Sequence, residues 1–133
     1  MHDLIIIGAG PAGLSASVYA SRYGIKHVIL GEVPGGLLTQ TFDVGNWLGT
    51  EAIGGQTFAD NAERHAKSYG VEMLPLTVEK ITKQGKMFEV SASGKTFQTK
   101  TVLIATGTKH RHLGVPGEQE FSGKGVSFCP TCD

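Results

Sequence analysis

Hydrophobic positions divide the first thirty residues into a strand, a helix and a second strand. Asp3–Ile7 is a short, mostly apolar run that ends at a glycine, as expected of a strand buried on both faces of a parallel sheet. Pro11–Tyr23 is predicted to be a helix, because proline is tolerated in the first turn and Gly24 is placed to end it. Lys26–Leu30 then completes a β-α-β unit. Alanine recurs every four residues in this helix, at Ala12, Ala16 and Ala20. We expect this side of small residues to pack against the sheet.

Further along, the pattern predicts one more helix and then mostly strands. Gln56–Tyr69 has helical character and is followed by a short strand at Val71–Leu74. Three runs of roughly alternating character are separated by short glycine turns, which predicts an antiparallel meander of Thr77–Thr82, Met87–Ala92 and Thr96–Thr99. Thr101–Ala105 is expected to be another buried strand. The fold class is therefore α/β and Rossmann-like, a parallel sheet with helices plus an antiparallel β-meander.

Two stretches of the chain lack periodicity, residues 31–55 and 108–133. A loop as long as the first is usually functional or disordered in a compact domain. Its apolar residues, among them Phe42 and Trp47, argue against disorder, so we interpret the stretch as a loop that lines a ligand. Trp47 fits core packing equally well.

Composition and charge exclude several classes of protein. The 12 basic and 12 acidic residues give a formal net charge of zero, so there is no electrostatic reason to expect nucleic acid or an anionic membrane as partner. No segment reaches the roughly 18 apolar residues of a membrane span. The first residues also lack the basic region and cleavage site of a signal peptide, so we expect a cytoplasmic protein.

The first glycine-rich turn carries the pattern of a dinucleotide-binding site, G-x-G-x-x-G, at Gly8, Gly10 and Gly13. The first glycine permits the sharp strand-to-helix turn, the second lets the backbone approach a pyrophosphate, and the third lets the helix pack on the strand. The pyrophosphate would bind N–H groups at the start of the helix, near Pro11 and Ala12. Glu32, just after the second strand, is the candidate for the ribose hydroxyls, and a solvated loop carboxylate is the alternative.

Near the end of the chain, Cys129 and Cys132 form a C-x-x-C pair. In a reducing compartment this spacing indicates redox or metal chemistry. The pair can form a small disulfide ring that thiolate attack closes and opens, and Asp133 could protonate a departing thiolate. A zinc site that also uses His110 and His112 is an alternative, as is an inert buried pair.

Short motifs follow one another along the whole chain: GAGPAG at 8–13, GG-x-L-T at 35–39, N-W-x-G at 46–49, I-A-T-G at 104–107 and C-x-T-C-D at 129–133. In this order and spacing they resemble the N-terminal portion of low-molecular-weight thioredoxin reductases. The alkyl hydroperoxide reductase flavoprotein uses the same cysteine pair and is the near alternative. Ferredoxin reductases of similar fold lack the pair and fit less well.

The resemblance implies a site for FAD. The segment Glu32–Thr39 would line the cofactor, Asn46 would lie near the flavin, and Val78 would make a backbone contact to the adenine. Residues 105–107 would close the site. The implied cofactor-binding residues are Gly8, Gly10, Pro11, Ala12, Gly13, Glu32, Gly35, Gly36, Leu37, Leu38, Thr39, Asn46, Val78, Ala105, Thr106 and Gly107.

The resemblance also implies a path for electrons, from NADPH through FAD to the cysteine pair and then to the disulfide of a thioredoxin-like protein. Cys132 would be the sulfur nearer the flavin and Asp133 the acid, while the sulfur that attacks the partner is left open. A homodimer is expected at full length.

Two residues depart from the family pattern, Leu37 where a glutamine is usual and Leu48 where a proline is usual. The length departs as well, because family members are more than twice as long and insert an NADPH domain before they complete the FAD site. We therefore expect residues 1–107 to be the first segment of a discontinuous FAD-binding domain, and 108–133 to be a connector and the start of the NADPH domain. The fold would then be incomplete and the chain alone inactive. A truncated flavin- or nucleotide-binding module without turnover is the alternative.

Overall fold

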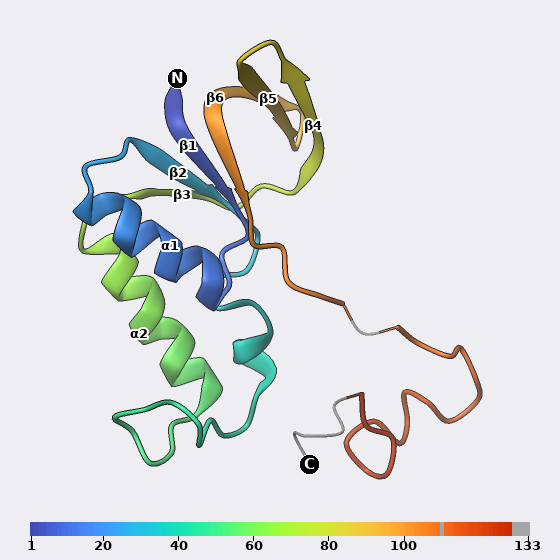
Figure 1. Ribbon diagram of the computed structural model, residues 1–133. Coiled ribbons are helices and arrows are strands. Elements are labelled where there is room, and N and C mark those ends of the chain that lie inside the picture. Colours follow the sequence, from blue (N-terminus) through green and yellow to red (C-terminus); the bar gives the residue numbers. More distant parts are fainter. Residues whose placement is uncertain (110, 129–133) are drawn as a thin grey trace.

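The computed structural model describes residues 1–109 and 111–128 of the chain (Figure 1). Its elements are β1 (His2–Ile7), α1 (Pro11–Arg22), β2 (His27–Leu30), the 3-10 helix η1 (Gly36–Gln40), α2 (Gly55–Lys67), β3 (Glu72–Leu74), β4 (Val78–Gln84), β5 (Met87–Ala92) and β6 (Lys95–Ile104). The sequence predicted each of these strands and the two α-helices to within a few residues, apart from the extent of β6, whereas the 3-10 helix was not predicted.

The strands form a 6-stranded mixed sheet in the order β3-β2-β1-β6-β5-β4. β1 pairs in parallel with β2 on one side and with β6 on the other. β3 extends the parallel part, and β4, β5 and β6 form the antiparallel meander. The predicted β-α-β unit and the α/β Rossmann-like class are thereby confirmed.

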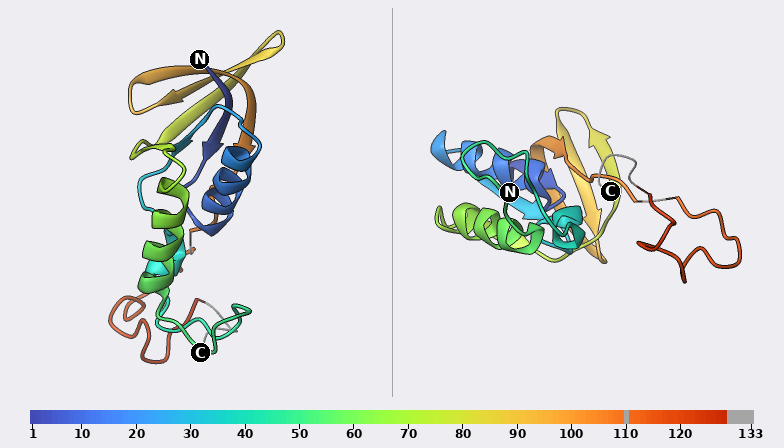
Figure 2. Two further views of the ribbon diagram at one scale, coloured as in Figure 1. Left: turned by 90° about the vertical axis from the view of Figure 1, so that its left-hand side faces the viewer. Right: turned by 90° about the horizontal axis from the view of Figure 1, so that it is seen from below.

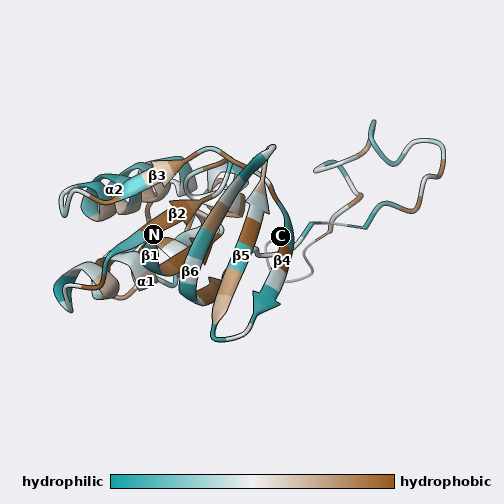
Figure 3. Cartoon of the chain, turned by 90° about the horizontal axis from the view of Figure 1, so that it is seen from above, coloured by the Kyte–Doolittle hydropathy of each residue, from teal (hydrophilic) through white to brown (hydrophobic). Residues whose placement is uncertain are grey.

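Alternate residues of β1 face two separate hydrophobic clusters. Ile6 packs with Leu14 of α1 and Ala66 of α2, so both helices cover the same face of the sheet (Figure 2). Ile5 and Ile7 belong to the other cluster, together with residues of β2 and β5. The meander therefore curls over the face that the helices leave open, and the parallel strands lie between the helices and the meander (Figure 3). Burial on both faces explains why β1 is apolar without alternation.

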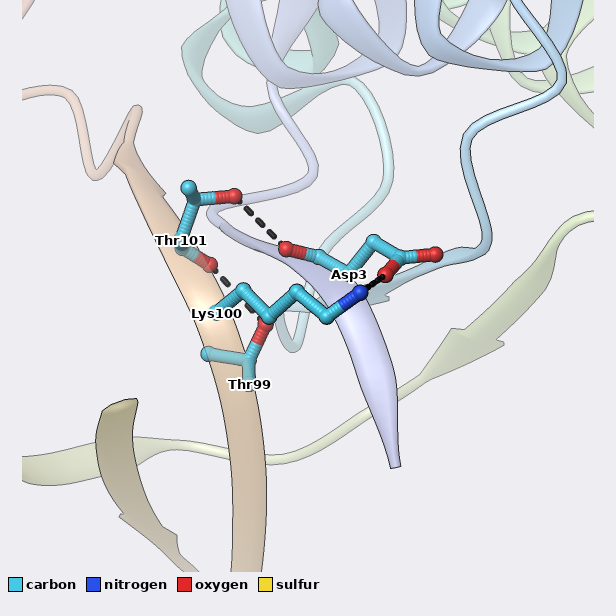
Figure 4. Close-up of polar contacts among 4 residues, drawn as sticks. All are labelled: Asp3, Thr99, Lys100 and Thr101. Carbon is cyan, nitrogen blue, oxygen red and sulfur yellow. Dashed lines mark hydrogen bonds and ion pairs between the residues drawn. The ribbon is translucent and has the colours of Figure 1, made fainter. Parts of the chain in front are cut away.

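β6 corrects the prediction of two separate strands at Thr96–Thr99 and Thr101–Ala105. It is one continuous strand that pairs with β5 through its first half and with β1 through its second half. The change occurs at Thr99, which is fully buried and donates a hydrogen bond from Oγ1 to the Thr101 carbonyl (3.0 Å) (Figure 4). Lys100, the polar residue that separated the two predictions, pairs with Asp3 of β1 at 2.6 Å. The second half is also less buried than predicted, since Ile104 is mostly exposed.

The predicted alanine face of α1 is wrong at Ala12, which is exposed, whereas Ala20 is buried and Ala16 packs against the core. The other buried residues of the helix are Gly13, Leu14 and Ser17. Leu14 takes a core position as well, so the buried side of the helix is wider than the alanine row and leaves out its first member.

The two aperiodic stretches differ in how they are held. Residues 31–54 contain η1 and an isolated bridge between Val44 and Ile53, so this loop is ordered by its own contacts. The segment after β6 runs away from the sheet (Figure 1).

In the described part of the chain, no helix is both long enough and apolar enough to cross a bilayer.

Candidate functional site

The glycine-rich turn lies where three parallel strands end together. The Gly8 N–H donates to the Leu30 carbonyl at 2.8 Å, and the Ala105 N–H donates to the Ile7 carbonyl at 2.8 Å. These bonds fix the ends of β1, β2 and β6 side by side. The chain leaves β1 for β2 through α1 on one side, while β6 arrives on the other, so the loops after these strands flank a topological switch point. Open α/β sheets bind their ligands at such points.

Gly8 and Gly13 are required by the packing of the protein itself. Gly8 has φ +111°, and a Cβ there would lie 2.1 Å from the Ala105 carbonyl oxygen. A Cβ on Gly13 would lie 1.9 Å from the Gly8 carbonyl oxygen. The first glycine thus makes room for the residue after β6, and the third lets α1 approach the turn, as the motif predicts.

Gly10 is different, because nothing in the described structure lies within 4 Å of the place where its Cβ would be. Its φ of −73° is open to any residue, so neither packing nor backbone conformation requires a glycine. The missing side chain leaves free space directly at the N-terminus of α1. This is the position at which the motif brings the backbone closest to a pyrophosphate, so the turn fits such a group.

The N-terminus of α1 is also suited to an anion. Gly10 is its N-cap and Pro11 its first residue; among the described residues, no side chain caps this end and no acidic residue lies in its first turn. The first N–H groups of a helix have no partner within the helix, and the helix dipole is positive at this end. Phosphate oxygens are the usual ligands of such an end.

The loop after β2 folds back onto the turn. The Gly35 N–H donates to the Ala9 carbonyl at 2.8 Å, and a Cβ on Gly36 would lie 3.3 Å from the Gly10 Cα. Gly35 also contacts α2, since its Cβ would lie 2.3 Å from the Ala59 Cβ. The structure therefore brings together two predicted segments, 8–13 and 35–39. Within the second segment Leu38 and Thr39 are half-buried, whereas Leu37 is exposed.

Glu32 is exposed just beyond β2, and its carboxylate accepts a hydrogen bond from the Thr77 hydroxyl. Thr77 precedes Val78, the first residue of β4. Val78 and Thr106 both line a pocket of about 220 Å³ at the ends of β1 and β6. The predicted positions on β4 and after β6 are thus neighbours of the turn, although they are far apart in the sequence.

Asn46 is not brought to the turn by any described contact. It is exposed and lines a separate hollow of about 460 Å³ formed by residues 45–51 alone. Trp47 in the same loop packs its ring 4.6 Å from the ring of Phe58 in α2. Phe42 and Leu48 are 97% and 98% exposed.

The predicted redox residues Cys129, Cys132 and Asp133 lie outside the described residues, as does His110 of the zinc alternative. Both chemistries therefore stay predictions. Within the described part of the segment after β6, the ring of His112 lies 5.0 Å from that of Phe128, and its Nδ1 is 3.4 Å from Glu118 Oε1.

Glu118 was missed by the sequence analysis. It is only 6% exposed, and its carboxylate accepts the N–H groups of Leu113 (2.8 Å) and Gly114 (2.7 Å). The Leu113 N–H, more than any other neighbour, holds the pKa of this carboxyl below its usual range. Nothing in the sequence marks the residue, because its partners are backbone groups of an aperiodic segment. Thr77 and Ser93 were missed for a similar reason, since their partners are distant along the chain.

A glycine turn at the switch point, an open helix N-terminus and an acidic residue after β2 define a dinucleotide-binding domain of the α/β class. Comparison with known proteins agrees with this class. The sequence pattern of the family described as pyridine nucleotide-disulphide oxidoreductase matches residues 2–133. The chain belongs to the pyridine nucleotide-disulphide oxidoreductase family.

Three proteins illustrate the similarity within this family. The chain is 41% identical to a thioredoxin reductase of Listeria monocytogenes over all of its own length and 42% of that protein. The crystal structure of thioredoxin reductase from Streptococcus pyogenes superposes with a TM-score of 0.90 at 40% identity, covering 100% of this chain and 44% of the other. A Bacillus subtilis protein named NADH dehydrogenase is 37% identical over 98% of this chain and 26% of its own length. The chain thus spans less than half the length of the relatives it matches.

Proposed function

We propose that these residues form the FAD-binding N-terminal part of an NADPH-dependent thioredoxin-disulfide reductase. The observation that carries the proposal is the free space at Gly10, because it gives a pyrophosphate direct access to the N-terminus of α1. The relatives named thioredoxin reductase support the choice of reaction.

Each predicted segment then has a role toward FAD. Residues 8–13 would bind the pyrophosphate, Glu32 the ribose, and 35–39 together with Asn46 would line the flavin side. Val78, Ala105, Thr106 and Gly107 would enclose the adenosine end and close the site. Gly35 and Gly36 keep the flavin-side loop against the turn through contacts that a side chain would block.

When bound, FAD would accept a hydride from the nicotinamide, chemistry that amino-acid side chains do not supply. The protein would place the cofactor and receive the electrons at Cys129 and Cys132, with Asp133 as proton donor. A thiolate of the reduced pair would attack the disulfide of a thioredoxin-like protein. We place 1–107 in a discontinuous FAD-binding domain and 108–133 in the connector to an NADPH domain. A cytoplasmic homodimer belongs to the same proposal.

The test uses the full-length gene product. We expect flavin absorbance that dithionite bleaches, and reduction of a thioredoxin with NADPH that Cys132→Ser abolishes while the flavin stays bound. Bound flavin without turnover on any thioredoxin would favour a binding module instead. Absence of both would overturn the proposal.

The electron donor has a second candidate. A solved structure titled ferredoxin-flavin thioredoxin reductase, from Clostridium acetobutylicum, covers 99% of this chain with a TM-score of 0.78 at 31% identity. Anaerobic flavin reduction by NADPH, NADH and reduced ferredoxin, compared side by side, distinguishes the donors. Rapid bleaching by ferredoxin alone would replace NADPH in the proposal.

A further inference from the structure

Glu32 is held by a side chain that comes from a different part of the sheet. Its carboxylate accepts the hydroxyl proton of Thr77, 45 residues further along the chain and directly before β4. We propose that Thr77 is a positioning residue for Glu32 and that Ser93, in the turn after β5, fixes Thr77 in turn. The inference rests on the proposed role of Glu32 in binding a ribose.

An exposed glutamate needs such a partner in order to bind a ribose well. Glu32 lies in the loop after β2, where a long flexible side chain has many rotamers and loses that freedom on binding. A carboxylate can accept about four hydrogen bonds. The Thr77 hydroxyl uses one of these acceptor positions and leaves the others for ribose hydroxyls. It therefore orients the Glu32 carboxylate without blocking its binding to a ribose.

Thr77 is itself held on both of its backbone groups by one residue. Its N–H donates to Ser93 Oγ at 3.1 Å, and its carbonyl accepts the Ser93 N–H at 3.1 Å. The two residues lie beyond the last pair of the β4–β5 ladder, Val78 with Ala92. This reciprocal pair fixes the position from which the Thr77 side chain reaches Glu32.

Ser93 adopts a conformation that serine rarely takes. With φ +47° it is the one non-glycine residue of the described chain in the left-handed region, and Gly94 follows with φ +74°. Two-residue hairpin turns of this kind favour asparagine or glycine at the first position. A glycine at position 93 would avoid the strain but would carry no hydroxyl for the Thr77 N–H. Backbone strain that is retained together with a specific contact points to a role for that contact.

A purely structural role is the competing explanation, since the same bonds also tie the loop after β2 to the start of β4. The two roles are distinguished by ligands that differ at the ribose, because only a positioning role makes the loss of affinity depend on the ribose hydroxyl. We would measure the Kd of the full-length gene product for ADP and for 2′-deoxy-ADP by calorimetry, and for FAD by quenching of flavin fluorescence. The variants are Thr77→Val, which keeps the shape without the hydroxyl, Thr77→Ser as rescue, and Thr96→Val as control. Thr96 is exposed on β6 and makes no side-chain hydrogen bond within the described residues.

We expect Thr77→Val to raise the Kd for ADP and FAD about 3- to 10-fold, the effect of one hydrogen bond. The Kd for 2′-deoxy-ADP should stay unchanged, and Thr77→Ser and Thr96→Val should bind ADP like the wild type. An unchanged ADP affinity in Thr77→Val, or an equal loss for both nucleotides, would overturn the inference.

Ser93→Gly keeps the inference testable if Thr77→Val folds poorly. It removes the strain and the hydroxyl together, so we expect an equal or higher Tm with weaker ADP binding, a combination that a structural role does not give. Unchanged ADP binding in this variant would count against the inference.

A wild-type protein that binds ADP and discriminates 2′-deoxy-ADP but does not take up FAD would overturn the proposed function and leave this inference standing. A wild type that binds neither nucleotide would overturn both.

Discussion

At the scale of single residues, Gly10 and Gly13 belong to one motif but are glycines for different reasons. A Cβ on Gly13 would overlap the Gly8 carbonyl oxygen, whereas a Cβ on Gly10 meets nothing within 4 Å. We expect Gly13→Ala to destabilise the fold by about 1–3 kcal/mol, because the backbone must shift to admit the methyl group. The measurement is urea unfolding of the apoprotein.

Gly10→Ala should leave the apoprotein as stable as the wild type and should weaken the binding of FAD. A methyl group there would enter the space proposed for the pyrophosphate, so FAD affinity should fall about tenfold or more, the equivalent of roughly 1.4 kcal/mol. Flavin fluorescence titration measures this directly. Wild-type FAD affinity in Gly10→Ala would contradict the proposed location of the pyrophosphate.

Glu118 gives a prediction on pH. Its pKa is lowered in the folded chain, chiefly by the Leu113 N–H, so the ionised carboxylate stabilises this segment at pH values above the ordinary glutamate pKa of about 4.3. That stabilisation is lost as the pH falls through the lowered pKa of the folded state. The amide NMR signals of Leu113 and Gly114 should therefore titrate together with a midpoint below about 4.3. In Glu118→Gln this titration should vanish, and a midpoint at or above the ordinary value would contradict the contact.

The residues predicted from the sequence are those whose role is local. Gly8, Gly10 and Gly13 follow a fixed spacing between a strand and a helix, and that spacing is visible without a structure. Thr77 and Ser93 act through contacts that span 45 and 16 residues, which no local pattern records. The redox pair was also predicted by spacing, and its geometry lies outside the described residues.

At the scale of elements, β6 joins the meander to the parallel half of the sheet, and Thr99 is the residue at which its partners change. We expect Thr99→Val to lose about 0.5–1.5 kcal/mol of unfolding free energy, because the Thr101 carbonyl loses its donor in a partly buried place. Urea unfolding measures the loss, with exposed Thr96→Val on the same strand as control. Equal losses in the two variants would show that the stability of β6 does not depend on this bond.

Hydrophobic patterning predicted nearly all elements because most of them bury one face or both. It divided β6 in two at Lys100, whose exposed side chain pairs with Asp3 of the neighbouring strand β1 within one continuous strand. It also placed Ala12 of α1 inward, whereas the buried side of that helix includes Leu14 and Ser17 instead. Each miss concerns a choice that long-range packing makes.

At the scale of the whole molecule, the loop 41–54 presents large apolar side chains to solvent. Phe42 and Leu48 are almost fully exposed, and such side chains promote association in water. We expect the isolated 133-residue chain to self-associate at high concentration, and Phe42→Ser with Leu48→Ser to shift it toward monomer. Sedimentation velocity measures the shift. The pair Ile81→Ser and Val115→Ser, also exposed but outside this loop, serves as control, and an equal shift there would argue against a localised patch.

The pairing of β1 with β6 has a consequence for synthesis on the ribosome. β1 emerges about a hundred residues before its second neighbour β6, whose paired residues begin at Thr99. At about 5–20 residues per second, the interval amounts to about 5–20 s. During that time the nascent chain carries Ile5–Ile7 with one unpaired edge, open to chaperones and to other nascent chains. The rate of translation between the two strands therefore sets how long this chain is at risk of misassembly.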